Sequence, residues 1–193
     1  MRYMIAYMLR GEPAHKVRQL SDELADVFRL ESQSGKSGPR LTLKAPFETN
    51  SERNFEELKA ALLKFATGRK PVPVVYDGFG QFDKRVIFVR VLPSPAAVAT
   101  VTELTKILRA LPWIKFTRTD GEKHMHATIC YAEKRNHYEE IKKYLAGETV
   151  HLEGFIDSVS ILGQVGDFRQ PWKLLVEFSF ADVPVTPLTE PEL

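Results

Sequence analysis

The chain has 193 residues, of which 44% are hydrophobic and 27% are charged, as in an ordinary soluble globular protein with one core or two small lobes. A net charge of +2 permits a phosphate-bearing ligand without requiring nucleic acid. The single cysteine, Cys130, excludes an internal disulfide. No apolar run reaches the length of a membrane span, and Arg10 interrupts the first apolar stretch too early for a signal peptide. We therefore expect a cytoplasmic protein with no membrane contact.

The first part of the chain predicts a strand, a helix, a strand and another helix. These are expected over 3–9, from Pro13, over 40–47 and over 51–66. The second part begins in the same way, with a strand over 86–92, a helix after the N-cap Ser94, a strand over 124–132 and a helix from Asn136 to near Gly147. Further strands are expected over 72–82, 152–162 and 172–180.

This order of elements occurs twice, approximately over residues 1–70 and 84–147. We therefore expect an α+β fold in a single domain spanning 1–193, with two pseudo-symmetric lobes. Each lobe would hold an antiparallel sheet with helices on its outer face, and the active cleft would lie between the lobes. The proline-rich tail over 183–193 is expected to be loose.

Two short strands carry similar polar residues: Arg40-Leu41-Thr42-Leu43 and His126-Ala127-Thr128-Ile129. Because side chains alternate along a strand, each strand presents its polar residues on one face and its aliphatic residues on the other. The polar faces would hold Arg40, Thr42 and Lys44 on the first strand and His124, His126, Thr128 and Cys130 on the second. This pattern predicts several hydrogen-bonding groups converging on one anion.

These strands and their context resemble the two-histidine phosphoesterases, the superfamily of the 2′-5′ RNA ligase-like proteins and cyclic phosphodiesterases. The signature of that family is His-x-Thr/Ser-x, present twice at about this separation. The segment 39–47 (PRLTLKAPF) is similar to the family's first motif strand, and 78–82 (GFGQF) is similar to its linker into the second half. The resemblance extends from residue 1 to about residue 180.

In that family the two histidines flank a phosphate, one as general base and the other as general acid, while the threonine hydroxyls hold phosphoryl oxygens. The resemblance implies that His126, Thr128 and Thr42 take these roles, and that Arg40 stands where the other histidine is expected. Arginine keeps its proton at neutral pH, so it cannot act as the base, but it can clamp a phosphate through two hydrogen bonds.

We therefore expect a protein that binds the cyclic or terminal phosphate of a nucleotide or RNA end. It would hydrolyse a cyclic phosphodiester with altered or impaired activity, using His126 as acid or base and Arg40 as clamp. The alternative is a non-catalytic nucleotide or RNA-end binding protein on the same fold, and ligation remains a further direction by resemblance. Substrate contacts are expected from Arg40, Thr42, Lys44, Thr128, His124 and Tyr131. No cofactor or metal is expected, and a monomer suffices.

Several alternatives stay open from the sequence. His124 or His15 would supply the missing acid–base group, His124 and His126 together would chelate a metal, or Arg40 would pair with an acidic neighbour on a relic surface. Other residues have both a structural and a binding interpretation: Tyr131, Phe47 and Phe168 as core or base-stacking residues, Lys44, Lys134 and Arg135 as solvated charges or a positive rim, and 78–80 as a turn. Cys130 is expected to pack in the core.

Overall fold

The computed structural model describes residues 1–33, 37–117, 120, 125–132, 135–166 and 170–180. The strands and helices follow in the order β1 (Arg2–Met8), α1 (Gly11–Phe28), β2 (Arg40–Glu48), α3 (Glu52–Ala66), β3 (Val72–Phe82), β4 (Val86–Pro93), α4 (Pro95–Arg109), β5 (His126–Tyr131), α5 (Arg135–Leu145), β6 (His151–Ile156), β7 (Ser158–Gln164) and β8 (Lys173–Ser179).

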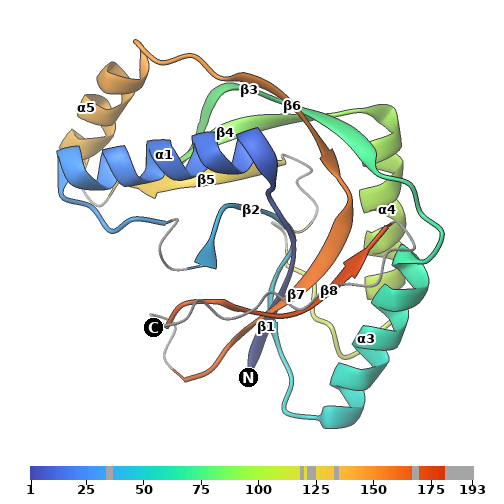
Figure 1. Cartoon of the computed structure of the whole chain (residues 1–193). Helices are drawn as coiled ribbons and strands as arrows, with labels where there is room; N and C mark the ends of the chain where they lie inside the picture. The colour runs from blue at the N-terminus through green and yellow to red at the C-terminus, as the bar shows by residue number, and fades with distance from the viewer. Residues whose placement is uncertain (34–36, 118–119, 121–124, 133–134, 167–169, 181–193) are drawn as a thin grey trace, which may run out of the picture.

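The strands form two four-stranded antiparallel sheets, with the orders β2-β1-β7-β8 and β5-β4-β3-β6 (Figure 1). The two sheets are built alike: β1 and β4 each lead into a helix, and the following strand, β2 or β5, returns to the edge of the same sheet. The predicted α+β fold with two related lobes is thus confirmed.

Helix starts follow from local capping. Ser94 accepts a hydrogen bond from the backbone N–H of Ala97 at the start of α4, and Pro95 occupies the first helical position. Ser51 accepts from the backbone N–H of Asn54 in the same way at the start of α3. These caps satisfy amide groups that have no partner inside the helix.

The helices pack on the sheets through apolar stripes. Helix α1 lies against β5 and β6, α4 lies against β3 and β4, and α3 lies against β7 and β8 (Figure 1). One continuous core includes residues from both sheets and from these helices, among them Ile5, Leu20, Leu62, Val89, Leu104 and Ile161. Full burial of each such side chain contributes about 1.5–3 kcal/mol. In the described part of the chain, no helix has both the length and the apolarity to cross a membrane.

Three boundaries differ from the sequence prediction. The single strand expected over 152–162 is divided at Asp157 into β6 and β7, which belong to different sheets. Helix α5 already includes Asn136, which therefore does not cap it. The glycines at 78 and 80 lie inside β3 and not in a turn, and side chains of β4 occupy the space over them.

Candidate functional site

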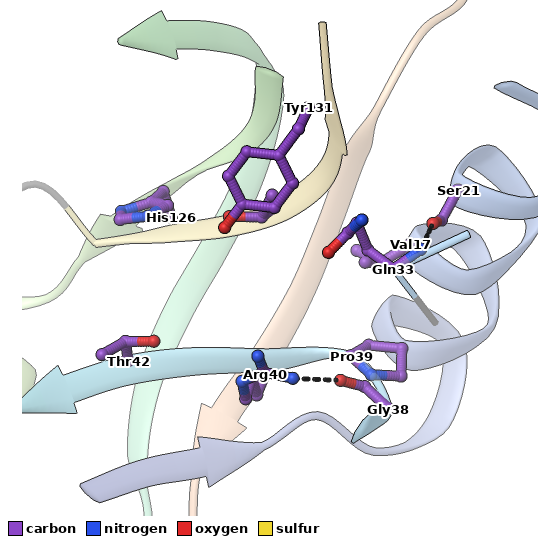
Figure 2. Close-up of a pocket in the computed structure, with 10 residues that line it drawn as sticks. Val17, Ser21, Gln33, Gly38, Pro39, Arg40, Thr42, His126 and Tyr131 are labelled. Carbon is purple, nitrogen blue, oxygen red and sulfur yellow. Dashed lines mark hydrogen bonds between the residues drawn. The ribbon is translucent and has the colours of Figure 1, made fainter. Parts of the chain in front are cut away.

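Strands β2 and β5 approach each other where the two sheets meet, and a pocket opens between them (Figure 2). Arg40 and Thr42 enter it from β2, and His126, Thr128 and Tyr131 enter it from β5. The pocket has a volume of about 100 Å³, and its lining residues are Val17, Ser21, Gln33, Gly38, Pro39, Arg40, Thr42, His126, Thr128 and Tyr131. That volume is several times the roughly 10–15 Å³ that one water molecule needs, so a group of several atoms fits.

Strand register sets these positions. On β2, Thr42 lies opposite Ala6 of β1 and Arg40 lies opposite Met8. On β5, Thr128 lies opposite Phe88 of β4. Directly opposed residues share a face of the sheet, so each strand presents its two polar residues on one side. The alternation expected for Arg40 with Thr42, and for His126 with Thr128, matches this arrangement.

Arg40 brings a positive charge into the pocket without a compensating carboxylate among the described residues. Its Nη1 donates to the carbonyl oxygen of Gly38 at 3.2 Å, and none of the described carboxylates pairs with it. Burial lowers the pKa of Arg40, and Tyr131 offsets part of this effect. The guanidinium nevertheless stays charged at neutral pH. The relic arrangement, with Arg40 tied to an acidic neighbour, is therefore not present in the described ranges. A desolvated, unpaired cation favours binding of an anion.

His126 packs against two aromatic rings of the same sheet. The ring centroids of Phe82 and Phe88 each lie 4.9 Å from that of His126, Phe82 at an interplanar angle of 87° and Phe88 at 50°. Phe82 and Phe88 also contact each other, with centroids 4.5 Å apart. These contacts, one edge-on and one tilted, limit the rotation of the imidazole. The ring is therefore preorganised at the pocket wall.

The remaining pocket groups are hydroxyls and one aromatic ring. The Thr42 hydroxyl faces the sulfur of Met4, at 3.5 Å, which is a weak acceptor. Thr128 lines the opposite side of the pocket. Tyr131 is 43% exposed, and its hydroxyl points toward the strand that carries Arg40 (Figure 2). Its ring is therefore available to a ligand.

Lys44 does not share the face of Arg40 and Thr42, so that part of the prediction is wrong. A β-bulge shifts the register between Thr42, opposite Ala6, and Lys44, opposite Ile5, which turns Lys44 into the core. There its Nζ lies 3.1 Å from the Oδ2 atom of Asp120, and the two side chains are 0% and 2% exposed. Lys44 does not line the pocket.

The carboxylate of Asp120 accepts hydrogen bonds from several donors. Besides Lys44, it accepts hydrogen bonds from the backbone N–H of Ala45 at 3.0 Å and from the backbone N–H and hydroxyl of Thr117 at 2.6 and 2.9 Å. Burial by itself raises the pKa of Asp120, but these hydrogen bonds outweigh it and leave the pKa below its usual range. The cluster ties the chain ahead of β5 to β2.

Other predicted residues lie elsewhere. His124, Lys134 and Phe168 fall outside the described residues, as does the side chain of Arg135. His15 is exposed on α1 and does not line the pocket, while Phe47 is buried in the core. Cys130 is buried in the core as expected, but it does not share the face of His126 and Thr128, because the register shifts between Ile87 and Phe88 on the partner strand. Burial raises the pKa of its thiol to about 12.

Sequence reasoning missed the part of the pocket that α1 supplies. Val17 and Ser21 lie one turn apart on its buried face, and the Ser21 hydroxyl accepts a hydrogen bond from the backbone N–H of Gln33 at 3.0 Å (Figure 2). The available signal was a small polar residue at Ser21 within the apolar stripe of the helix. No sequence pattern indicates Gln33, because its position in the pocket depends on how the loop after α1 folds back.

The chemistry of the site is that of an oxyanion receptor with one proton-transfer group. A guanidinium, two threonine hydroxyls and an imidazole line the pocket, and its described lining contains no carboxylate. In the described ranges, no three His, Cys, Asp or Glu side chains come together in a way that could hold a metal ion. The donor set suits a phosphate more than a cation.

Comparison with known proteins agrees with the fold. TT0787 of Thermus thermophilus matches with a TM-score of 0.68 and 17% identity, over 93% of this chain and 98% of its own. E. coli LigT, solved with 3′-AMP, matches with a TM-score of 0.62 and 12% identity over 92% and 97%. Usb1 of Kluyveromyces marxianus matches with a TM-score of 0.52 and 10% identity over the same shares.

None of the curated proteins matches this chain in sequence. The sequence pattern of the 2′-5′ RNA ligase superfamily, however, matches residues 9–167, which is most of the chain. The two antiparallel sheets and the pocket between β2 and β5 agree with this match. The chain therefore belongs to the 2′-5′ RNA ligase superfamily.

Proposed function

We propose that the pocket between β2 and β5 binds the cyclic or terminal phosphate of a nucleotide or RNA end and hydrolyses a cyclic phosphodiester slowly. The observation that carries this proposal is the charge of Arg40, which meets two threonine hydroxyls and His126 in one pocket without a carboxylate among the described lining residues. Phosphate oxygens satisfy all of these donors together.

Arg40 acts in this proposal as an electrostatic clamp. By resemblance to the family motif, it occupies the position of the first histidine. A guanidinium can donate two parallel hydrogen bonds to phosphoryl oxygens and stabilise the negative charge that develops on them in the transition state. It cannot take a proton from water at neutral pH.

His126 then supplies the proton transfer that the described lining of the pocket can offer near neutral pH. It either accepts a proton from the attacking water or donates one to the leaving ribose oxygen, and the other transfer proceeds through solvent. Loss of one general acid–base group costs about 10²–10⁴ in rate. The proposed hydrolysis is accordingly slow, and its rate has one ionisation in place of a bell-shaped dependence on pH.

Ligands of similar proteins support the phosphate assignment. E. coli LigT has been solved with 3′-AMP, with NADP+ and with ATP, all of which carry phosphate. For the present chain, the phosphate group that these ligands share is the proposed occupant of the pocket.

The test measures cleavage of nucleoside 2′,3′-cyclic phosphates and of short RNA that ends in a cyclic phosphate. We expect slow turnover by the natural chain, no turnover by His126→Ala, and a gain of about 10²–10⁴ with a bell-shaped pH profile in Arg40→His. Circular dichroism of each variant serves as the folding control. Turnover that survives His126→Ala contradicts the assigned role of His126.

The second candidate is a non-catalytic RNA-end or nucleotide binding protein, and the chemistry of Arg40 favours it. A charged guanidinium strengthens binding of the phosphate and contributes no proton transfer. If the natural chain binds a nucleoside 3′-phosphate but leaves cyclic phosphates intact while Arg40→His cleaves them, this second function is the correct one.

A further inference from the structure

The face of the β5-β4-β3-β6 sheet that carries His126 continues well beyond the pocket. Arg90 of β4 lies directly opposite His126 and therefore on the same face. Its side chain is 52% exposed, and it does not line the pocket. A second cationic group thus stands one strand, about 4.8 Å, beyond the strand of His126.

Two contacts with Asp77 fix the side chain of Arg90 but engage only part of its guanidinium. Its Nε donates to the backbone carbonyl oxygen of Asp77 at 2.9 Å, and its Nη2 lies 3.6 Å from the carboxylate of the same residue. A guanidinium has five N–H donors, so these contacts leave most of them unengaged by the described residues. The fixed guanidinium can therefore still donate hydrogen bonds to an oxyanion.

Glycine provides the space on which Arg90 lies. Gly78 is part of a β-bulge in β3 and has φ 62°, and a Cβ there would lie 2.8 Å from the Nη2 atom of Arg90. The guanidinium therefore rests directly on the backbone of β3. Any side chain at position 78 would displace it.

Beyond Arg90 the same face carries two exposed apolar side chains. Leu92 lies opposite Val75, and Phe155 of β6 lies opposite Pro73, one step further along the strands. Leu92 is 50% exposed and Phe155 is 56% exposed. Phe155 is two strands away from Arg90 and further along the sheet, so the two groups are spaced along one face and are not side by side. An arginine and an exposed aromatic ring along one path are groups that bind phosphates and bases of single-stranded nucleic acid.

Charges on this face are mixed. Asp77 is engaged by Arg90 and by His151, whose Nδ1 lies 3.1 Å from it, and Glu153 stands opposite Val75. The carboxylate nearest Arg90 is therefore already paired, and the Arg90 side chain remains 52% exposed on the open face. The continuity with the pocket, which has no carboxylate in its described lining, favours a polyanion that enters along this path.

We infer that Arg90, seated on Gly78, and Phe155, further along the same face, form a second subsite for a single-stranded RNA whose terminal phosphate occupies the Arg40–His126 pocket, in which Phe155 stacks on a later base. This inference rests on the proposed function and adds its substrate class, which is an oligonucleotide end and not a mononucleotide. The pocket binds the terminal phosphate, and Arg90 binds the next phosphate along the chain.

The test compares two probes that end in the same group: a nucleoside 3′-phosphate and a hexauridylate with a 3′-phosphate. In Arg90→Gln we expect hexauridylate binding to weaken about tenfold or more, with mononucleotide affinity unchanged. The slope of log K against log salt for hexauridylate should fall in magnitude by about 0.7, the value for one phosphate contact on a single strand. Phe155→Ser should likewise weaken only hexauridylate binding.

Matched controls on α3 remove one arginine and one apolar side chain that is as exposed as Phe155. Arg53→Gln deletes one arginine and Leu63→Ala trims one exposed apolar side chain, and neither should alter either affinity. Arg40→Gln should weaken both probes, because both place a phosphate in the pocket.

The outcomes separate the two proposals. If the mononucleotide binds through Arg40 and hexauridylate affinity is the same in Arg90→Gln, the second subsite is overturned and the pocket stands. If Arg90→Gln weakens both probes equally, Arg90 serves the pocket and the subsite is again overturned. If the natural chain binds neither probe, the proposed function fails and the subsite fails with it. A dimer that Phe155→Ser dissolves, with hexauridylate affinity unchanged, would assign this face to self-association instead.

Discussion

The buried charge of Arg40 lowers the stability of the free protein but favours the binding of an anion. Its guanidinium is partly buried and its hydrogen bond to Gly38 satisfies one of five donors. No carboxylate in the described ranges neutralises it, so the folded protein holds a charge whose desolvation is offset only when an anion arrives. Functional sites commonly carry such locally unfavourable groups.

Replacement of Arg40 by methionine should therefore stabilise the protein while removing its ligand. Methionine fills similar space without a charge, so we expect the free energy of unfolding to rise by about 0.5–2 kcal/mol. Inorganic phosphate should raise the melting temperature of the natural chain and not that of the variant. Urea unfolding with and without phosphate measures both effects, with Arg53→Met on α3 as the matched control. A variant that is less stable and still responds to phosphate would refute the role of Arg40.

Strand β3 shows how an element supports a pocket residue that it does not carry. Gly80 lies opposite Phe88, and a Cβ at position 80 would overlap the Phe88 ring. That ring in turn contacts His126. The absence of a side chain on β3 is therefore a condition for the position of the imidazole on β5.

Gly80→Ala should accordingly disturb both packing and the site. The added methyl group must push the Phe88 ring aside, which costs about 1–3 kcal/mol of stability, and the ring then displaces His126. Urea unfolding measures the first effect, and the NMR chemical shifts of the His126 ring measure the second. Gly147→Ala, where the nearest atom to a Cβ is 3.8 Å away, is the matched control and should change neither. Unchanged His126 shifts in Gly80→Ala would contradict the proposed support.

How well the sequence predicts the site differs from one element to another. Alternation placed Arg40 with Thr42 and His126 with Thr128 correctly, because each pair is separated by one residue of regular strand. It failed at Lys44, since one extra residue in a bulge reverses the faces and nothing in the local sequence indicates a bulge. A continuous β-prone run likewise concealed the change of sheet at Asp157. Such features depend on partner strands and not on the segment itself.

At the scale of the molecule, the buried Lys44–Asp120 pair joins the two motif strands across the sheets. Lys44 lies on β2 of one sheet, and Asp120 lies in the chain leading to β5 of the other. The Nζ of Lys44 also lies 4.8 Å from the ring centroid of Phe116. Removal of one member of a buried pair leaves the other charge uncompensated, so Asp120→Ala should lower the free energy of unfolding by about 3–5 kcal/mol.

The pair also gives stability a defined dependence on pH. The pKa of Asp120 is lower in the folded protein than in the unfolded chain, where it is about 3.9. Its contribution is therefore fully present above that value and is lost as the pH falls through the folded pKa. Urea unfolding between pH 7 and pH 2 should show a shallower acid loss in a Lys44→Met/Asp120→Leu double variant than in the natural chain. Parallel curves for the two proteins would contradict this assignment.

At Asp157 the chain passes directly from β6 of one sheet to β7 of the other. One residue separates strands of different sheets, and its carbonyl oxygen accepts a hydrogen bond from the backbone N–H of Phe180 at 2.8 Å. Both sheets share one core, and this connection of one residue is too short to let them move apart. Association should therefore be a single bimolecular step, with an observed rate that rises linearly with ligand concentration and shows no plateau.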